Sequence, residues 1–527
     1  MKKFALVQIL LLLTVSAFSR ILHVPADYST IQKAVYASNI NDDTILVSPG
    51  TYSQFVAIGK SLVIASLYLT TGDTSYISQT ILTGTLSNRA VKLESYGSDL
   101  PMTLTGFTIQ NGHAPSNNGG GIYIAYCKVT LSHLKVKDNY SGKNGGGIYI
   151  KDSDVTINHC EFTGNKATQP TSNNRDEIYK GGAIAIRSSV PHTFTVNHSS
   201  FTNNKAFYGG AIYDLHGFGG QTKCRFYDCN FDDNEARMYA GAIYIIGDSA
   251  FVERCSFQNN ISYTGGAVMV YPYSYLKVEN CLIAGNRGGL ELASNKAIIS
   301  NTTITDNGCI HKPIYINYSS AVYFFNSIAW NICGKEFEMN YDNRLYVSHS
   351  TIQHDTNSVL ITDIDNSVYW GDSISGLWPV FKGWYDYHLK PESPCIGAGV
   401  DSVKMNGFWF NAPQVDIDDS LRPGPAGTNP DVGAYENSRG LPVSINESKA
   451  VANFTIYPNP STGAVSFHNN TGLPVDDLII YDLSGRKVAH HSKVYGDINI
   501  SGLPKGMYLV VFKTKKETVK QKLVVNY

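Results

Sequence analysis

The sequence predicts an all-β protein, a right-handed parallel β-helix followed by a small C-terminal β-sandwich of immunoglobulin type. The six residues GGGIYI occur at Gly119–Ile124 and again at Gly145–Ile150, and variants begin at 181, 209, 240, 265 and 288. A second element of the form F-x-x-N, or a close variant, follows each copy, as in CEFTGN and CSFQNN. Repetition at such intervals is typical of solenoids, in which each repeat forms one coil.

The chain begins with the features of a secretory signal peptide. Lys2 and Lys3 precede an apolar run over Phe4–Val15, and Ala17-Phe18-Ser19 fits a cleavage site. We therefore expect residues 1–19 to be removed. A transmembrane anchor is the alternative, but the run is too short, and no later segment has enough consecutive apolar residues to span a bilayer.

The charge balance argues against strongly anionic partners. The chain has 42 Lys and Arg against 43 Asp and Glu, which leaves a net charge of −1. This balance provides no general attraction to nucleic acid or to an anionic membrane surface, so neither is an expected partner.

Residues 20–390 are predicted to form the β-helix, with about a dozen coils. Each period contains short alternating runs such as I-Y-I, V-T-I and C-E-F, separated by Gly, Asn and Asp, which is the pattern of strands joined by turns. The repeated glycines are expected at a tight or left-handed corner. An internal aromatic stack is expected from Phe162, Phe201, Phe231 and Phe257.

Four of the nine cysteines occupy one inward position. They are interpreted as buried thiols, with a disulfide between neighbouring coils as the alternative, and the sequence alone does not give the pairing of the nine. These four are Cys160, Cys229, Cys255 and Cys281.

One asparagine of each F-x-x-N element is expected to form a ladder at a second corner. Stacked side-chain amides can bond one another and the turn backbone. The predicted ladder consists of Asn139, Asn165, Asn204, Asn234, Asn260, Asn286 and Asn307.

The predicted ligand-binding residues are four tyrosines that share one outward position, in a column interrupted by Ala185. A flat aromatic stripe on a rigid rod can stack on sugar rings. The alternative is stacking between strands that only stabilises the sheet. The four are Tyr123, Tyr149, Tyr213 and Tyr244.

No catalytic residue and no firm metal site are predicted. His133, His159 and His198 share one position in successive copies, which makes them weak metal candidates, but the column continues with Asp, Arg and Asn as in an ordinary polar turn. Asp416, Asp418 and Asp419 are weak Ca²⁺ candidates, with a solvated loop as the alternative.

Catalysis by paired carboxylates is not supported by the repeats. Asp232 and Asp233 are adjacent in one coil, but the matching positions of the coils on either side carry no acid.

The repeat region resembles the pectin-lyase-like superfamily of right-handed parallel β-helices. The opening segment HVPADYSTIQKAVYASNINDDTILVSPGTY resembles the N-terminal capping unit of that superfamily. The GGAI and F-x-x-N elements are similar to repeats of chlamydial polymorphic outer-membrane adhesins. SPCIGAG, DIDDSLRPG and PDVGAYE resemble a choice-of-anchor segment, which implies a cap on the last coil over residues 391–437.

The C-terminal residues 453–527 resemble a type IX secretion sorting domain. The matching motifs are FTIYPNPSTGAVSF, LIIYDLSGRKV and INISGLPKGMYLVVF. The resemblance implies handling by the type IX secretion machinery, export across an outer membrane, and attachment to the cell surface or release. Residues 438–452 are expected to be a linker.

Two functional hypotheses remain from the sequence. The regular coils and the absence of a carboxylate cluster favour a non-catalytic adhesin or glycan-binding rod on the cell surface. The alternative is a secreted polysaccharide lyase or glycoside hydrolase that acts on pectin-like polymers. The sequence identifies neither the ligand nor the oligomeric state.

Overall fold

The computed structural model describes residues 19–439 and 454–525. It has gaps at 40–41, 86, 96–99, 169–178, 217–222, 248, 273, 294–295, 309–312, 458, 460, 462–463, 470–474, 483–485, 495–497, 501 and 515–517. The predicted signal peptide, up to residue 18, and the predicted linker from residue 440 lie outside the described residues. Two compact units, residues 1–440 and 441–527, are each described separately.

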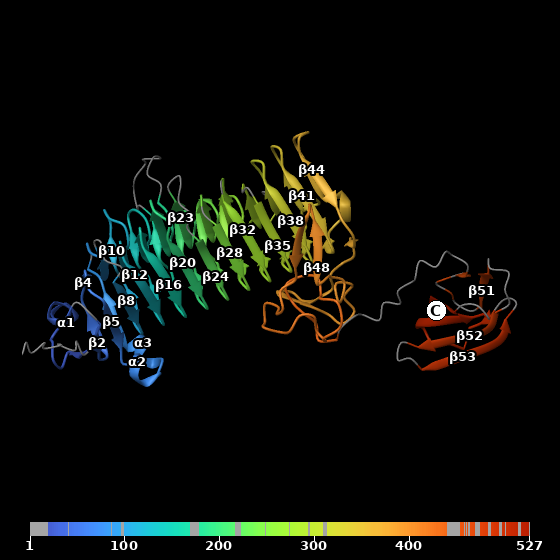
Figure 1. Cartoon of the computed structure of the whole chain (residues 1–527), viewed down its shortest axis with the longest axis horizontal. Coiled ribbons are helices and arrows are strands. Elements are labelled where there is room, and N and C mark those ends of the chain that lie inside the picture. The colour runs from blue at the N-terminus through green and yellow to red at the C-terminus, as the bar shows by residue number, and fades with distance from the viewer. Residues whose placement is uncertain are drawn as a thin grey trace, which may run out of the picture. The chain divides into compact units, whose positions relative to one another are not determined.

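The first unit is a right-handed parallel β-helix of about 12 turns, which confirms the predicted fold class. A 14-stranded sheet runs from β1 (Ile21–Val24) to β44 (Ser367–Trp370). A 13-stranded sheet begins at β3 (Gly50–Tyr52), and a 12-stranded sheet begins at β4 (Phe55–Ile58). Their successive strands follow one another along the rod (Figure 1).

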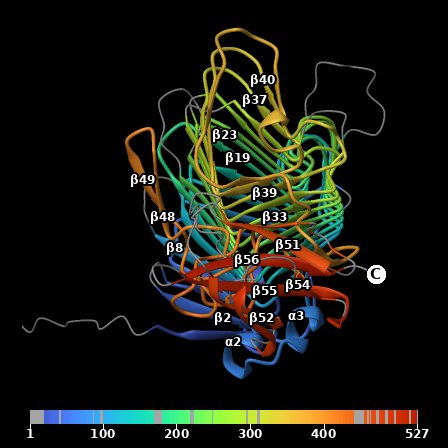
Figure 2. The same cartoon turned by 90° about the vertical axis from the view of Figure 1, so that its right-hand side faces the viewer.

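A single coil shows how the chain visits these sheets in turn. It passes through the 12-stranded, 14-stranded and 13-stranded sheets and then through a short strand of a six-stranded sheet. The strands of this coil are β11 (Ile122–Ala125), β12 (Lys128–Ser132), β13 (Lys135–Lys137) and β14 (Tyr140–Ser141). Figure 2 shows the unit from one end, with β19 (Ile184–Ser188) and β23 (Ile212–His216) of the 12-stranded sheet labelled.

The interior contains the predicted aromatic stack. Phe162, Phe201, Phe231 and Phe257 are completely buried, and successive rings are nearly parallel with centroids 4.7–4.8 Å apart. This distance matches the spacing between hydrogen-bonded strands, because each ring lies directly above its equivalent in the next coil.

The four inward cysteines are buried free thiols, as predicted. Burial raises the pKa of the Cys160 thiol to about 12, so it stays protonated. Cys333, which is outside this column, is disulfide-bonded.

The asparagines of the F-x-x-N elements form a continuous hydrogen-bonded ladder. In each rung the side-chain Nδ2 donates to Oδ1 of the next asparagine, as from Asn139 to Asn165 at 3.0 Å and from Asn286 to Asn307 at 3.0 Å. Asn331 extends the ladder beyond the predicted seven. Its backbone N and Nδ2 donate to the Glu336 carboxyl at 2.8 and 2.6 Å, so Glu336 ends the ladder.

Left-handed backbone explains the glycine pairs. Gly145 has φ 68° and Gly181 has φ 64°, a conformation in which a Cβ is unfavourable. The second glycine is needed for space, because a Cβ on Gly146 would lie 2.4 Å from the Gly182 carbonyl oxygen of the next coil.

The N-terminal end of the core is covered by helix α1 (Ile31–Ala37). Its N-cap residue, Thr30, accepts a hydrogen bond from the Lys33 N–H at 3.2 Å. Ile31, Ala34 and Val35 are buried in the main core. This short amphipathic helix therefore closes the first coils.

The parallel coils end at β45 (Ile374–Ser375), before the predicted boundary at residue 390. Residues 376–437, here called the lateral segment, contain two antiparallel hairpins. The first consists of β46 (Phe381–Gly383) and β47 (Asp386–Leu389). The second consists of β48 (Ser402–Met405) and β49 (Phe408–Asn411).

The predicted cap on the last coil is wrong in its placement, because the lateral segment packs against the sides of several coils. Phe381 and Leu389 share an apolar cluster with Leu282 and Ile328 on the outer face of the 13-stranded sheet. The second hairpin contributes its own residues to a cluster on the outer face of the 14-stranded sheet. Among the described residues, no further strand pairs with β44.

The second unit is a pair of small antiparallel sheets around one apolar core, consistent with the predicted immunoglobulin-like sandwich. Leu478, Phe512 and Leu523 are completely buried in that core. Its strands are β50 (Phe454–Tyr457), β51 (Ala464–Asn469), β52 (Val475–Asp482), β53 (Lys487–Val494), β54 (Ile498–Asn499), β55 (Gly506–Lys513) and β56 (Thr518–Val525).

Candidate functional site

The four predicted tyrosines do align in one column on the 12-stranded sheet. Tyr123 pairs with Tyr149, Tyr149 with Ala185, Ala185 with Tyr213, and Tyr213 with Tyr244. However, Tyr149, Tyr213 and Tyr244 are at most 5% exposed. The predicted flat, exposed stripe is therefore wrong for these three, and only Tyr123 is partly accessible.

Neighbouring aromatic side chains bury this column. Tyr208 and Tyr239, from the six-stranded sheet, contact Tyr244 with ring centroids 5.9 and 5.8 Å away. Tyr213 and Tyr244 meet edge to face at 5.5 Å. These rings form a second apolar cluster outside the main core, so their arrangement matches the stabilising alternative for Tyr213 and Tyr244.

The three predicted histidines form a real stack at the corner between the 14-stranded and 13-stranded sheets. The rings of His133 and His159 are 5.1 Å apart, and those of His159 and His198 are 4.8 Å apart. Each residue has φ near +50°, which the corner requires. Burial lowers the pKa of His133, and the neighbouring His159 lowers it further.

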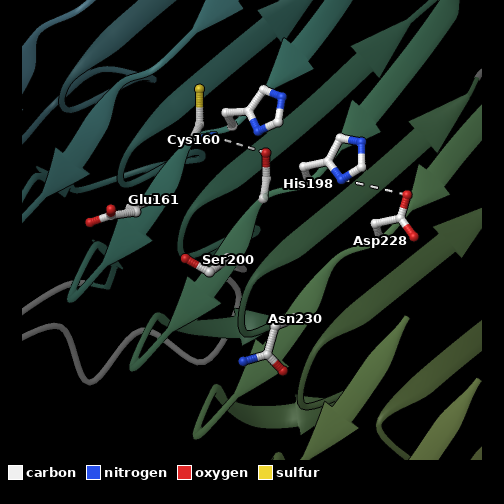
Figure 3. A pocket seen from close by; sticks show the side chains of 8 residues that line it. Cys160, Glu161, His198, Ser200, Asp228 and Asn230 are labelled. Carbon is white, nitrogen blue, oxygen red and sulfur yellow. Dashed lines mark hydrogen bonds and ion pairs between the residues drawn. The ribbon is translucent and has the colours of Figure 1, made fainter. Parts of the chain in front are cut away.

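A shallow groove of about 460 Å³ lies beside this stack (Figure 3). His198 points toward Asp228, with Nδ1 3.5 Å from a carboxylate oxygen. The Arg254 guanidinium binds the same carboxylate at 2.6 and 2.7 Å. The Asp228 carboxylate is therefore already neutralised by a bidentate partner.

The Ser199 hydroxyl of the groove is bound to the backbone, and the Glu161 carboxylate lies 3.4 Å from the Lys135 ammonium. The Ser199 hydroxyl accepts from the Cys160 N–H at 3.1 Å and donates to the Asn197 carbonyl at 2.8 Å. Nucleophilic catalysis would need a hydroxyl or thiol in contact with a base. The groove as described can offer hydrogen bonds to a ligand but contains no activated nucleophile among its described residues.

The weak metal candidates do not converge on a common point. The histidine rings stack face to face, and no group of three metal-binding side chains occurs among the described residues. Asp416 accepts backbone N–H bonds from Asp418, Ser420 and Glu436. Asp418 instead binds His388 at 2.7 Å, and Asp419 lies 3.6 Å from Arg254.

The SPCIGAG, DIDDSLRPG and PDVGAYE motifs of the lateral segment build a buried polar core. The Arg422 side chain is fully buried, 3.3 Å from Glu436, and donates to the Asp431 carbonyl at 2.8 Å. The Asp431 carboxyl accepts from the Gly397 N–H at 2.7 Å, and burial raises its pKa to about 7. These side chains therefore have a structural role.

The two most exposed tryptophans among the described residues lie on the two hairpins of the lateral segment, and neither was among the predicted site residues. Trp384, at the tip of the first hairpin, is 94% exposed, and Tyr385 beside it is also exposed. Trp409 on the second hairpin is 67% exposed, and the Lys404 ammonium lies 5.9 Å from its ring. The sequence feature that could have indicated this exposure is Trp384, which lies in a short turn between Lys382 and Asp386.

Comparison with known families agrees with both units. The model described as "Right handed beta helix region" matches residues 63–231 and 241–369, and "Secretion system C-terminal sorting domain" matches residues 455–526. The sorting domain indicates secretion with attachment to the cell surface or release. Among the described residues, helices are all too short or too polar to cross a membrane.

Two solved structures show weak overall similarity. An alginate lyase in complex with G6 is 12% identical, with 77% of this chain and 92% of that chain covered at a TM-score of 0.39. A pectin methylesterase from Aspergillus niger is 11% identical, with 68% and 86% covered at a TM-score of 0.23. No curated protein matches, and these scores say nothing about activity. Because the first family model covers more than half of its length, the chain belongs to the right-handed β-helix family.

Proposed function

We propose that the protein is a non-catalytic rod at the cell surface that binds glycans through the exposed aromatic residues of its lateral segment. The proposal rests mainly on the exposure of Trp384 and Trp409 on two hairpins of one segment. Large aromatic side chains exposed in this way commonly mark recognition surfaces. Their flat faces suit the apolar face of a sugar ring.

The mounting of the hairpins supports recognition by a rigid surface. Inward-facing residues of the first hairpin, such as Phe381 and Tyr387, pack on the outside of the coils. The Tyr387 hydroxyl also donates to Asp306 at 3.1 Å. Each hairpin therefore has one face fixed to the β-helix while its exposed aromatic side chains need little reordering when a ligand binds.

The larger of the two cavities described here, the groove beside the histidine stack, is one place where the enzymatic alternative could act. The Asp228 carboxylate there is bound by Arg254, and Ser199 is bound by backbone groups. Polysaccharide cleavage needs a free general base or a facing pair of carboxylates. The aromatic hairpins therefore give the better-supported function.

A glycan array tests the proposal with the secreted protein. We expect the wild type to retain a subset of glycans, and Trp384→Ala combined with Trp409→Ala to weaken binding about tenfold or more. Ile364→Ala is the matched control, because Ile364 is equally exposed but not aromatic. Unchanged binding by the double variant contradicts the proposal. New reducing ends released by the wild type from pectin-like polymers would instead support the enzyme.

A further inference from the structure

One coil differs from its neighbours at three positions that lie close together. Ala185 replaces the column tyrosine, and its partners in the adjacent coils are Tyr149 and Tyr213. Before the glycine pair this coil has Lys180, where the adjacent coils have Asn144 and Tyr208. The third change is Arg187, which pairs with Lys151 on one side and with Leu215 on the other.

The missing tyrosine ring leaves a slot between two aromatic walls. Strands two positions apart in a sheet are separated by about 9.6 Å, so a ring between them would lie roughly 4.8 Å from each wall. That separation is within the range at which rings stack. A cavity of about 60 Å³ is found there, lined by Tyr149, Ala185 and Tyr213 together with Lys180 and Arg187. A cavity of this size has room for a small charged group.

The slot is positively charged. The Lys180 ammonium lies 4.7 Å from the centre of the Tyr213 ring. Burial lowers the pKa of Lys180, and the positive charge of Arg187 lowers it further. Among the described residues, the charged group that acts on the Lys180 ammonium is Arg187; Asp176 and Glu177 lie outside the described residues. The nearby Asp152 carboxylate bonds to Ser189, through both its N–H and its hydroxyl.

Two adjacent cations, one of them half-buried, are unfavourable without an anion. Aromatic walls on either side add a preference for a ring. We infer that this slot binds the charged group of an acidic sugar residue, with a carboxylate or sulfate at Lys180 and Arg187 and the sugar ring outside, at the mouth between Tyr149 and Tyr213. The slot would add a site for charged groups to the proposed glycan binding. It rests on that proposed function only in the assumption that the anion belongs to a glycan.

The most direct test fills the slot with tyrosine, the residue that occupies this position in both adjacent coils. Ala185→Tyr should complete the column and leave the melting temperature of the full chain unchanged or higher. Glucuronate and glucose 6-sulfate are the two probes, titrated at low salt and followed by calorimetry, with glucose as the neutral comparison. We expect at least one acid to bind and Ala185→Tyr to weaken that binding about tenfold or more.

A second variant separates charge from space. Lys180→Gln should weaken the acid about tenfold, whereas Lys128→Gln removes the same charge from the exposed outer face of β12 and should have no effect. The better probe identifies carboxylate or sulfate as the preferred group. Binding of neither acid, or wild-type affinity in well-folded Ala185→Tyr, would overturn the inference.

The outcome is separable from that of the proposed function. The variant lacking Trp384 and Trp409 should bind the acidic monosaccharide as the wild type does, because the slot lies on the 12-stranded sheet, away from the hairpins. Monosaccharide binding without retention of any arrayed glycan would contradict the rod function and leave the slot standing. Loss of monosaccharide binding in the tryptophan variant would contradict the slot.

Discussion

Removal of one ladder amide should destabilise the β-helix far more than a change beside it. The Asn234 side chain donates to the Phe201 carbonyl at 2.8 Å and to Asn260 at 3.0 Å. Its Oδ1 accepts from the backbone N and the Nδ2 of Asn204 at 3.1 and 3.0 Å. Asn234 is completely buried, so water cannot replace these bonds.

The expected cost follows from the groups left without partners. One or two unsatisfied buried groups cost about 1–3 kcal/mol each, so Asn234→Ala should lose about 2–5 kcal/mol. For a unit of this length the unfolding entropy is roughly 0.9 kcal/mol/K, which corresponds to a melting temperature lower by about 2–5 °C. Circular dichroism of the full chain during heating measures the shift.

The control is Asp233→Asn in the same turn. Asp233 is exposed with φ 53°, and Asn203 and Asn259 occupy the equivalent positions of the adjacent coils with φ 56° and 53°. We expect a change below about 0.5 kcal/mol. Alanine would be a poor control there, because left-handed backbone costs it roughly 1 kcal/mol. Equal shifts for Asn234→Ala and Asp233→Asn would refute the assignment of stability to the ladder.

Three further predictions follow from buried charge and from the division into units. Arg422→Met should lose about 3–5 kcal/mol because Glu436 would be left buried and unpaired, whereas the exposed Arg344→Met should be nearly neutral in the same melting assay. Burial raises the pKa of Glu336 to about 7, so its contribution to stability is fully present below the unfolded-state pKa and is lost as pH rises through about 7. Glu336→Gln should therefore weaken the fall in melting temperature between about pH 5 and pH 8, and an identical fall in both proteins would contradict this. Deletion of residues 454–527 should trap a folded β-helix in the periplasm, measured by surface proteolysis and circular dichroism, and surface display of the truncated chain would refute the sorting role.

Features that repeat from coil to coil could be predicted from the sequence. The phenylalanine stack and the asparagine ladder depend only on which residues share a position, and the glycine-pair and F-x-x-N elements fix that register. A β-helix converts equal spacing in sequence into direct contact, because equivalent residues lie one strand apart. Glu336 ends the ladder in one coil only, so no repeat pattern predicts it.

Features that depend on segments between the repeats were not predictable in this way. Outward direction was correctly assigned to Tyr213 and Tyr244, but alternation along a strand does not reveal what covers the outer face. Tyr208 and Tyr239 cover it because the six-stranded sheet extends each of these coils. The lateral segment likewise packs beside coils that precede it by well over 100 residues in the chain, as between Asn280 and Val415 and between Arg254 and Asp419.

The corner between the 14-stranded and 13-stranded sheets shows how one structural requirement serves two purposes. From His133 onward each coil has a residue with φ near +50° there, and most of these residues are His, Asp or Asn, which tolerate this conformation. In three successive coils, at 280, 301 and 326, this residue is an asparagine. Asn280 donates to the Val415 carbonyl of the lateral segment at 2.6 Å, and Asn326 both donates to the Val400 carbonyl and accepts from its N–H.

In the earlier coils the same position is His133, His159 and His198, whose rings stack on one another, and the ring of Tyr68 packs on His133 with centroids 4.5 Å apart. Arg254 lies at the junction, bound to Asp228 on one side and 3.6 Å from Asp419 of the lateral segment on the other. The lateral segment therefore stops where the corner residue changes from amide to charge. Amide side chains at this backbone position thus hold the lateral segment at Asn280 and Asn326, whereas the His133 corner is covered by Tyr68.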